Sequence, residues 1–228
     1  MDLITALKSL DHYLFFTLNG LAGREALLDA FGIFTAKGLI WVMGLAAFWL
    51  LYRVPRVPLI TTIIPPHRRW FFPSGAPRAL HTVFIDGKRT LCGGWACAAA
   101  AVAGGLGWGA RMLLARVFGR TRPYLYEGVH NLFTKGAADY AFPSGHTTIA
   151  FALAFSIQFF APRYGALFLF CALMVGLGRI FIGAHYPADV AAGAVLGYLS
   201  AVIARWVVTK AMHLKTNNKS QIQISNVK

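Results

Sequence analysis

Residues 91–110 read LCGGWACAAAAVAGGLGWGA and contain no charged side chain over 20 positions. An α-helix needs about 20 predominantly apolar residues to cross the hydrocarbon core of a bilayer. A helix on the surface of a soluble domain would instead carry polar residues along one face. This stretch therefore predicts a transmembrane helix.

Four more stretches have the same apolar character. The three nearest the C-terminus reach spanning length once the polar residues at their ends are included. The four are residues 38–52, which 30–36 extend across Lys37, and residues 147–162, 164–178 and 190–204.

A sixth stretch, residues 3–21, is interrupted by Lys8, Asp11 and His12. A charge at the centre of a bilayer costs about 2.5–3.5 kcal/mol on insertion scales. This helix is therefore either a sixth span or an amphipathic helix that lies partly in the membrane interface. Together the six stretches predict an all-α fold, a polytopic membrane helical bundle with about six transmembrane helices.

The composition agrees with a membrane protein. Hydrophobic residues make up 57% of the 228 residues and charged residues 13%, whereas about 25% charged is usual in soluble domains. The net charge of +14 lies between the apolar stretches, which indicates membrane topology and anionic lipids as partners, and no nucleic acid. The length predicts one membrane-embedded domain over residues 1–212, followed by a disordered polar tail at 213–228.

Lysine and arginine are concentrated in three segments that connect or follow the predicted helices. These are the loop 53–90, which also holds six prolines, the turn 161–164 and the tail after Ala204. In an alternating six-helix arrangement they share one side, and the positive-inside rule makes that side cytoplasmic. Five arginines fall on the opposite side, where phosphate binding would explain them. They are Arg111, Arg116, Arg120, Arg122 and Arg179.

Pro143-Ser144-Gly145-His146 stands at the start of an apolar stretch. Proline ends any preceding helix, and serine can cap the next one. The first-turn amides would then face an anion, and Gly145 lets that anion approach the backbone. His146 lies in the same turn, where an imidazole suits general acid–base catalysis. A lone membrane histidine is more often structural, so the interpretation depends on the next motif as well.

A second histidine, His185, lies just before the last apolar stretch, and Asp189 lies in its first turn. If the Asp189 carboxylate accepts one ring N–H of His185, the other ring nitrogen becomes a better nucleophile. Asp189 could also complement the helix dipole. Arg122 and Arg179 are fork-shaped donors suited to phosphoryl oxygens. No cluster of carboxylates accompanies them to bind magnesium, so we expect no metal and no other cofactor.

The three motifs resemble those of the type 2 phosphatidic acid phosphatase superfamily, in its membrane branch. The family pattern is Lys-x6-Arg-Pro, Pro-Ser-Gly-His and Ser-Arg-x5-His-x3-Asp, and the resemblance covers roughly residues 91–205. It implies a metal-independent lipid phosphatase whose active site faces the periplasm or cell exterior. By this resemblance His185 forms a phosphohistidine, His146 protonates the leaving group and Asp189 supports His185. Phosphate would be held by four residues, Arg122, Ser144, Gly145 and Arg179.

The chain departs from the family pattern at two positions. The family serine is Gly178 here, and the family lysine falls on Ala115. Three basic residues are candidates to replace the lysine. The leading two are Arg111, one turn earlier on the same helix face, and Arg116, next in sequence, and the third is Arg120. Because Arg120 is closer to the following loop, the alternative for this residue is that it is solvated.

The segment from Asn19 to Asp29 and the spacing from Arg122 to Pro143 resemble bacterial undecaprenyl-diphosphatases of this superfamily. The resemblance implies hydrolysis of undecaprenyl diphosphate to undecaprenyl phosphate in the bacterial inner (plasma) membrane. Phosphatidylglycerophosphate, phosphatidic acid and lipid A phosphatases are alternatives of the same class. The alternative of another class is a non-catalytic membrane protein that binds or transports lipids. The sequence indicates no oligomeric state.

Overall fold

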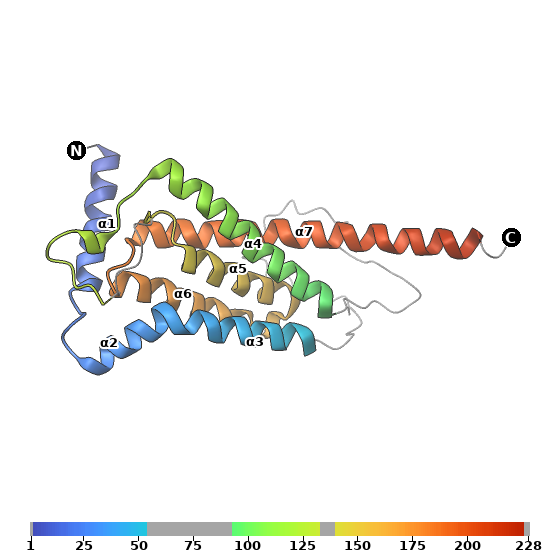
Figure 1. Ribbon diagram of the computed structural model, residues 1–228, viewed down its shortest axis with the longest axis horizontal. Helices are drawn as coiled ribbons and strands as arrows, with labels where there is room; N and C mark the ends of the chain where they lie inside the picture. The colour runs from blue at the N-terminus through green and yellow to red at the C-terminus, as the bar shows by residue number, and fades with distance from the viewer. Residues whose placement is uncertain (1, 54–92, 133–139, 226–228) are drawn as a thin grey trace, which may run out of the picture.

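The computed structural model describes residues 2–53, 93–132 and 140–225, with side chains in the last helix as far as Ala211. All regular structure in these residues is helical, which confirms the predicted all-α fold (Figure 1). The predicted cytoplasmic loop 53–90 lies outside the described residues, apart from Arg53 at the end of a helix. The elements are α1 (Leu3–Asn19), α2 (Ala26–Ile33), the π-helical turn η1 (Phe34–Gly38), α3 (Leu39–Arg53), α4 (Gly93–Phe118), the 3-10 turn η4 (Pro123–Leu125), α5 (Gly145–Phe160), the 3-10 turn η5 (Pro162–Tyr164), α6 (Gly165–Phe181) and α7 (Pro187–Ser225).

α2, η1 and α3 form one helical run, which lies beside α4, α5, α6 and α7 along the long axis of the molecule (Figure 1). α5 is central, because it packs against α3, α4, α6 and α7. It is apolar but shorter than the four helices that, among the described residues, are long and apolar enough to cross a membrane. Those four are Ala26–Tyr52, Gly94–Leu125, Pro162–Phe181 and Pro187–Ala211.

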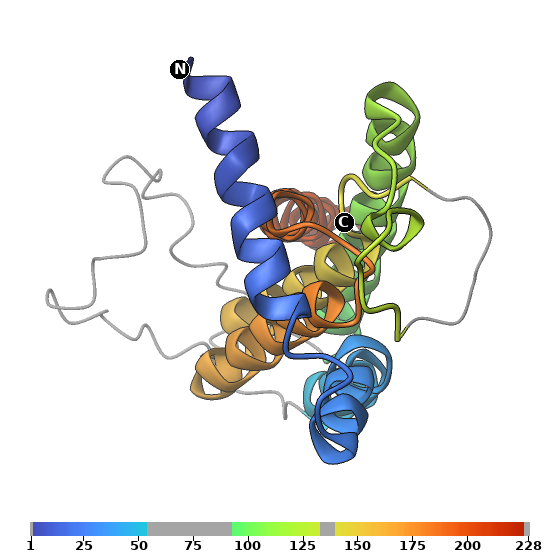
Figure 2. The ribbon, with the colours of Figure 1, turned by 90° about the vertical axis from the view of Figure 1, so that its left-hand side faces the viewer.

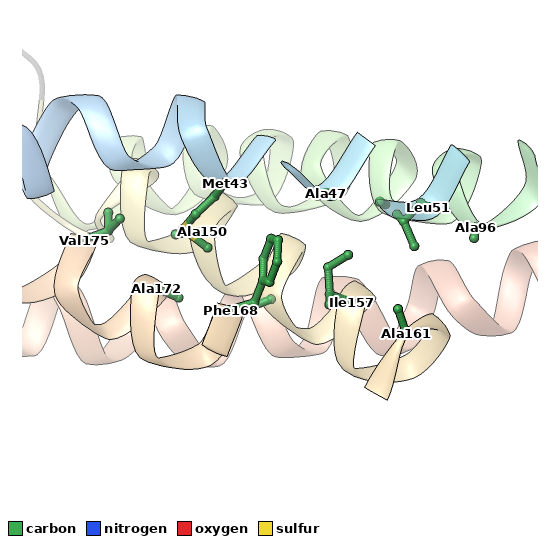
Figure 3. Close-up of a cluster of buried hydrophobic side chains, with 12 residues drawn as sticks. Met43, Ala47, Leu51, Ala96, Ala150, Ile157, Ala161, Phe168, Ala172 and Val175 are labelled. Carbon is green, nitrogen blue, oxygen red and sulfur yellow. The ribbon is translucent and has the colours of Figure 1, made fainter. Parts of the chain in front are cut away.

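Small side chains allow these helices to pack closely around α5 (Figure 3). The largest buried cluster includes Ala150 of α5 and Ala172 of α6, together with Met43 of α3. Small residues at helix contacts are typical of membrane bundles, where backbones approach closely. Large apolar side chains such as Trp41 and Val117 are instead 75% and 78% exposed, as expected of a surface that faces lipid.

α1 crosses the end of the bundle at a steep angle to the other helices, in front of the ends of α6 and α7 (Figures 1 and 2). Asp11, Phe15 and Asn19 are its buried residues, whereas Leu3 and Leu7 are exposed. α1 is therefore not a sixth helix along the bundle axis. Its geometry agrees with the other expectation, an amphipathic helix at the membrane interface.

α7 continues to Ser225, so the backbone of residues 213–225 is helical where the sequence predicted a disordered tail. The chain has no glycine or proline after Gly197. Polar side chains alone do not end a helix, and glycine and proline, which often do so, are absent from this part of the sequence.

The two ends of the bundle are chemically different. The end of α4, the start of α5, the end of α6 and the start of α7 meet at the end that α1 crosses (Figure 1). The end of α3 and the turn η5 lie at the opposite end. The three sequence motifs therefore share one end of the bundle, as the alternating topology predicted.

Candidate active site

The Pro-Ser-Gly-His motif forms the first turn of α5, with Ser144 at the N-cap position. The Ser144 hydroxyl makes no capping hydrogen bond and accepts instead from the Thr147 hydroxyl at 2.9 Å. The prediction that this side chain caps the helix was therefore wrong. The backbone N–H of Ser144 donates to the Asp189 carbonyl at 3.0 Å, so the start of α5 is joined to the start of α7.

Gly145 allows α4 to approach this turn closely. A Cβ atom at Gly145 would lie 3.1 Å from the ring of Trp108 and 3.5 Å from Nε of Arg111. The glycine thus brings a basic side chain of α4 against the N-terminus of α5, where the helix dipole already favours an anion.

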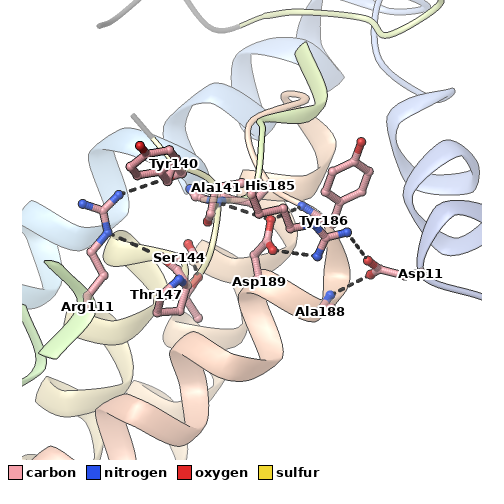
Figure 4. A network of polar contacts seen from close by, with 12 residues as sticks. Asp11, Arg111, Tyr140, Ala141, Ser144, Thr147, His185, Tyr186, Ala188 and Asp189 are labelled. Carbon is pink, nitrogen blue, oxygen red and sulfur yellow. Dashed lines mark hydrogen bonds and ion pairs between the residues drawn. The ribbon is translucent and has the colours of Figure 1, made fainter. Parts of the chain in front are cut away.

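His185 is buried, with 1% of its surface exposed, and a backbone carbonyl fixes its ring. Its Nδ1 lies 2.8 Å from the carbonyl oxygen of Ala141 (Figure 4). A carbonyl oxygen can only accept a hydrogen bond, so we place the ring proton on Nδ1. Nε2 then presents its lone pair, as a nucleophile requires.

Asp189 does not make the expected hydrogen bond with His185. Its Oδ2 is 3.7 Å from Nδ1 of His185 and accepts the backbone N–H of Tyr186 at 2.9 Å. Its Oδ1 accepts from Arg120 at 2.8 Å. The prediction that Asp189 orients the imidazole directly is corrected by this geometry, because the Ala141 carbonyl already takes the Nδ1 proton.

Burial lowers the pKa of His185 well below its ordinary value of 6.5, and the charges of Arg179 and Arg122 lower it further. A charged imidazole would lose hydration and face two cations. His185 is therefore neutral at neutral pH, which is the state in which Nε2 can attack phosphorus.

Arg122 and Arg179 are both buried, at 6% and 2% exposure, and lie within electrostatic reach of His185. Two like charges close together inside a protein destabilise each other, and an anion bound between them relieves that repulsion. Arginine also matches the tetrahedral phosphoryl oxygens with parallel N–H donors. The structure thus brings both predicted phosphate ligands close to His185.

His146, in the first turn of α5, is only partly buried. It lies within electrostatic reach of Arg179, His185 and Arg122. All three sequence motifs therefore converge on one small volume, with one imidazole buried and the other closer to the surface. This arrangement suits a buried nucleophile and a second histidine that exchanges protons with the leaving group.

Of the three arginines considered as replacements for the family lysine, Arg111 lies against the Pro-Ser-Gly-His turn. It is buried, and its Nε and Nη2 donate to the carbonyl oxygens of Pro143 and Tyr140 at 3.4 and 3.3 Å. Arg116 is exposed on the outer surface of α4. Ala115, at the family lysine position, is 4% exposed.

Arg120 lies between two carboxylates, so the alternative that it is solvated near the loop is wrong. Its guanidinium group is 2.6 Å from Asp11 and 2.8 Å from Asp189. Asp11 was not among the predicted site residues, yet a charge inside a mostly apolar helix is the signal that could have identified it.

Gly178, at the family serine position, packs against the π-helical turn η1. A Cβ atom there would lie 2.5 Å from the Thr35 hydroxyl and 2.7 Å from the backbone nitrogen of Ala36. The space that a serine side chain would need is therefore already filled by the backbone of η1. The departure from the family pattern is explained by this contact.

The sequence profile of the PAP2 superfamily matches residues 92–213, more than half of the chain. The chain belongs to the PAP2 superfamily. The matched region contains all three motifs and every element that meets at the site except α1 and η1. Among the described residues of this PAP2 protein, no group of three or more His, Cys, Asp or Glu side chains could hold a metal ion.

Three bacterial relatives are similar over part of their length. The bacitracin transport permease protein BcrC of Bacillus licheniformis is 49% identical over 72 residues, 32% of this chain and 36% of that protein. The lipid A 1-phosphatase of Rhizobium etli is 44% identical over 91 residues, 37% of this chain and 38% of that protein. The undecaprenyl-diphosphatase BcrC of Bacillus subtilis is 38% identical over 78 residues, 34% of this chain and 40% of that protein. The aligned part of the chain thus spans no more than two fifths of these relatives.

The likeness to a solved structure extends over most of the chain. LpxE of Aquifex aeolicus superposes with a TM-score of 0.56 at 24% sequence identity, covering 86% of this chain and 94% of that one. At this identity the comparison supports the fold, a helical PAP2 bundle.

Proposed function

We propose that this PAP2 protein is an integral-membrane lipid phosphatase that works through a phosphohistidine on His185. The observation that carries the proposal is the hydrogen bond from Nδ1 of His185 to the Ala141 carbonyl. It leaves Nε2 unprotonated beside Arg122 and Arg179. A neutral imidazole held next to two buried cations suits attack on a phosphoryl group.

The reaction has two steps. Nε2 of His185 attacks phosphorus, the bond from phosphorus to the leaving oxygen breaks, and His146 donates a proton to that oxygen. Water then attacks the phosphohistidine while His146 takes its proton, so that the N–P bond breaks and free phosphate leaves. The arginines and the first-turn amides of Gly145 and His146 stabilise the charge on the equatorial oxygens in both steps.

Arg111 completes the phosphate site in place of the family lysine. It is buried against the Pro-Ser-Gly-His turn, 3.4 Å from the Pro143 carbonyl. Arg111 lies one helical turn from Ala115, and an arginine side chain is long enough to span one turn. Its guanidinium group can therefore reach the position that the ammonium group of the family lysine would occupy.

The substrate we propose first is undecaprenyl diphosphate, hydrolysed to undecaprenyl phosphate. Support comes from the spacing of the motifs and from similarity to a protein named undecaprenyl-diphosphatase. A lipid A 1-phosphatase is 44% identical over 91 residues, against 38% over 78 residues for the undecaprenyl-diphosphatase, so lipid A is the second candidate. In either case the apolar exterior of the bundle keeps the protein in the bilayer where the substrate resides.

The location we propose is the bacterial inner membrane, with the active site facing the periplasm or exterior. The basic residues in the sequence of the loop 53–90, the turn 161–164 and the tail after Ala204 support this orientation, because positively charged segments remain in the cytoplasm. The substrate phosphate would then be met at the outer leaflet.

A phosphate-release assay with purified protein tests the proposal. The panel contains undecaprenyl diphosphate, lipid A, phosphatidylglycerophosphate and phosphatidic acid, each with and without EDTA. We expect release from at least one lipid, fastest from undecaprenyl diphosphate and unchanged by EDTA. Activity that disappears in EDTA and returns with magnesium would contradict the mechanism.

The same panel separates the enzyme from the non-catalytic alternative. A headgroup binder would retain these lipids without releasing phosphate, whereas an enzyme releases phosphate and loses that ability in His185→Ala. His130→Ala is a suitable control, because His130 is an exposed histidine with no role in the proposed chemistry.

A further inference from the structure

Two charged residues contact the active site but have no role in the proposed mechanism. They are Asp11 of α1 and Arg120, which follows α4. Asp11 is 8% exposed. The Arg120 guanidinium donates to Asp11 Oδ2 at 2.6 Å and to Asp189 Oδ1 at 2.8 Å. The other oxygen of Asp11 accepts the backbone N–H of Ala188 at 2.7 Å. One cation therefore bridges a carboxylate of α1 and a carboxylate of α7 (Figure 4).

Two lines of contact lead from Arg120 to His185. The Arg120 side chain holds Asp189, whose other oxygen accepts the N–H of Tyr186, the residue after His185, at 2.9 Å. The Arg120 carbonyl accepts the N–H of Ala141 at 2.7 Å. The Ala141 carbonyl in turn accepts from Nδ1 of His185 at 2.8 Å. The side chain and the main chain of one residue thus fix the imidazole and its backbone.

Aromatic contacts add to this arrangement. The Arg120 guanidinium lies 4.2 Å from the centre of the Tyr186 ring. His12 of α1 stacks on the same ring, with 5.1 Å between ring centres. The side chain next to His185 is therefore held by Arg120 and by α1, and the position of α1 affects the position of the nucleophile.

We propose that Asp11 and Arg120 are positioning residues for His185, and that the docking of α1 completes the active site. The inference rests on the proposed function. The Asp11 carboxylate pairs with Nη2 of Arg120, while Asp189 pairs with Nη1. Asp11 also holds the first turn of α7 by accepting the backbone N–H of Ala188. Misplacing a reacting group by about 1 Å can lower a rate by about 100-fold. Because neither side chain contacts the substrate in this role, their loss should lower kcat and leave KM unchanged.

The test measures kcat and KM of Asp11→Asn and Arg120→Gln in detergent, with a lipid that the wild type hydrolyses. We expect kcat to fall by about tenfold to a hundredfold in each, with KM within about twofold. The double variant should be no slower than Arg120→Gln, because both changes act through the same contacts. Lys8→Gln is the matched control, since Lys8 is exposed on the same helix, and should behave as wild type.

Arg120→Lys supplies an independent reading if Arg120→Gln fails to fold. Lysine keeps the charge but lacks the planar fork that bonds two carboxylates at once. The kcat of Arg120→Lys should therefore also lie below that of the wild type. Wild-type kcat in Asp11→Asn and in the Arg120 variants overturns the inference. A raised KM with unchanged kcat also overturns it and assigns the pair to lipid binding.

A wild type that releases no phosphate from any lipid removes the proposed function and this inference together, whereas an active wild type with unchanged variants removes this inference alone.

Discussion

The chemistry of His185 is set by its surroundings: the Ala141 carbonyl fixes the tautomer, and burial, together with the charges of two arginines, keeps the ring neutral. His185→Ala removes the nucleophile, and His146→Ala removes the proton donor. We expect each change to lower phosphate release by about 100-fold or more, because a general acid–base alone contributes about that much. Phosphate trapped on His185 from a labelled lipid would identify the nucleophile directly. More than about a tenth of the wild-type rate in either variant would contradict the assigned role.

The lowered pKa of His185 also predicts how folding stability depends on pH. In the unfolded chain this histidine binds a proton as the pH falls through 6.5, whereas the folded chain keeps it neutral to a much lower pH. The unfolded state then holds one more proton, so stability falls by about 1.4 kcal/mol for each pH unit below that value. The melting temperature of wild type should fall more steeply with acidification than that of His185→Gln. Parallel melting curves for the two proteins would show that His185 has an ordinary pKa.

Arg111 is the residue we expect to replace the family lysine. Arg111→Ala should raise KM or lower kcat by about tenfold or more, since a buried charge-assisted contact to phosphate is lost. Adding Ala115→Lys should partly restore that variant. Arg116→Ala should have little effect, because Arg116 is exposed on the outer surface of α4. If Arg111→Ala behaves as wild type, phosphate is held without this third basic side chain.

The residues of the motifs could be predicted from sequence because their spacing is specific to this chemistry. The contacts of His185 could not. The partner of Nδ1 is the backbone carbonyl of Ala141, and a carbonyl has no residue-type signature. The pairing of Asp11 with Arg120 joins residues more than a hundred positions apart, which a single sequence without an alignment does not reveal.

At the level of elements, the π-helical turn η1 depends on Gly178 of α6. Gly178→Ser, which restores the family residue, would force its Cβ into the Ala36 backbone, 2.7 Å from the nitrogen. The Ala36 carbonyl accepts from Arg179 at 3.5 Å, so displacing η1 also disturbs a phosphate ligand. We expect a loss of roughly 1–3 kcal/mol in stability, as for other overpacked sites, and lower activity.

Gly105→Ser is the matched control for this prediction. Gly105 also lies within a helix, but nothing lies within 4 Å of a Cβ atom built there. Thermal unfolding in detergent should therefore show a lower melting temperature for Gly178→Ser only. Equal melting temperatures for the two variants would show that η1 adjusts to the serine without cost.

The helices along the bundle axis were predicted correctly because uninterrupted apolar stretches leave few alternatives in a membrane. α1 was ambiguous for the opposite reason. Lys8, Asp11 and His12 argue against a span, but whether such charges find partners is decided by tertiary contacts. In the structure Asp11 finds Arg120 and Ala188, and those contacts hold α1 across the end of the bundle.

At the scale of the whole molecule, the direction of α1 decides on which side the N-terminus lies. A spanning α1 would place the first residues beside the predicted cytoplasmic loop 53–90. The observed α1 keeps them at the end where the motifs meet (Figure 2). The turn η5 lies at the opposite end of the bundle (Figure 1). The two arrangements therefore differ in the side that Lys8 occupies, while both place Arg163 of η5 in the cytoplasm.

Cysteine labelling distinguishes them. In a chain whose native cysteines are replaced by serine, Lys8→Cys and Arg163→Cys are treated in intact cells with a thiol reagent that does not cross the inner membrane. Both positions are exposed in the structure, so accessibility depends on the side of the membrane alone. We expect Lys8→Cys to react in intact cells and Arg163→Cys only after permeabilisation.

Protection of both positions would mean that α1 spans the membrane, and the contacts between Asp11 and Arg120 could then not form as described. Reaction of Arg163→Cys in intact cells would reverse the orientation and place the phosphate site in the cytoplasm.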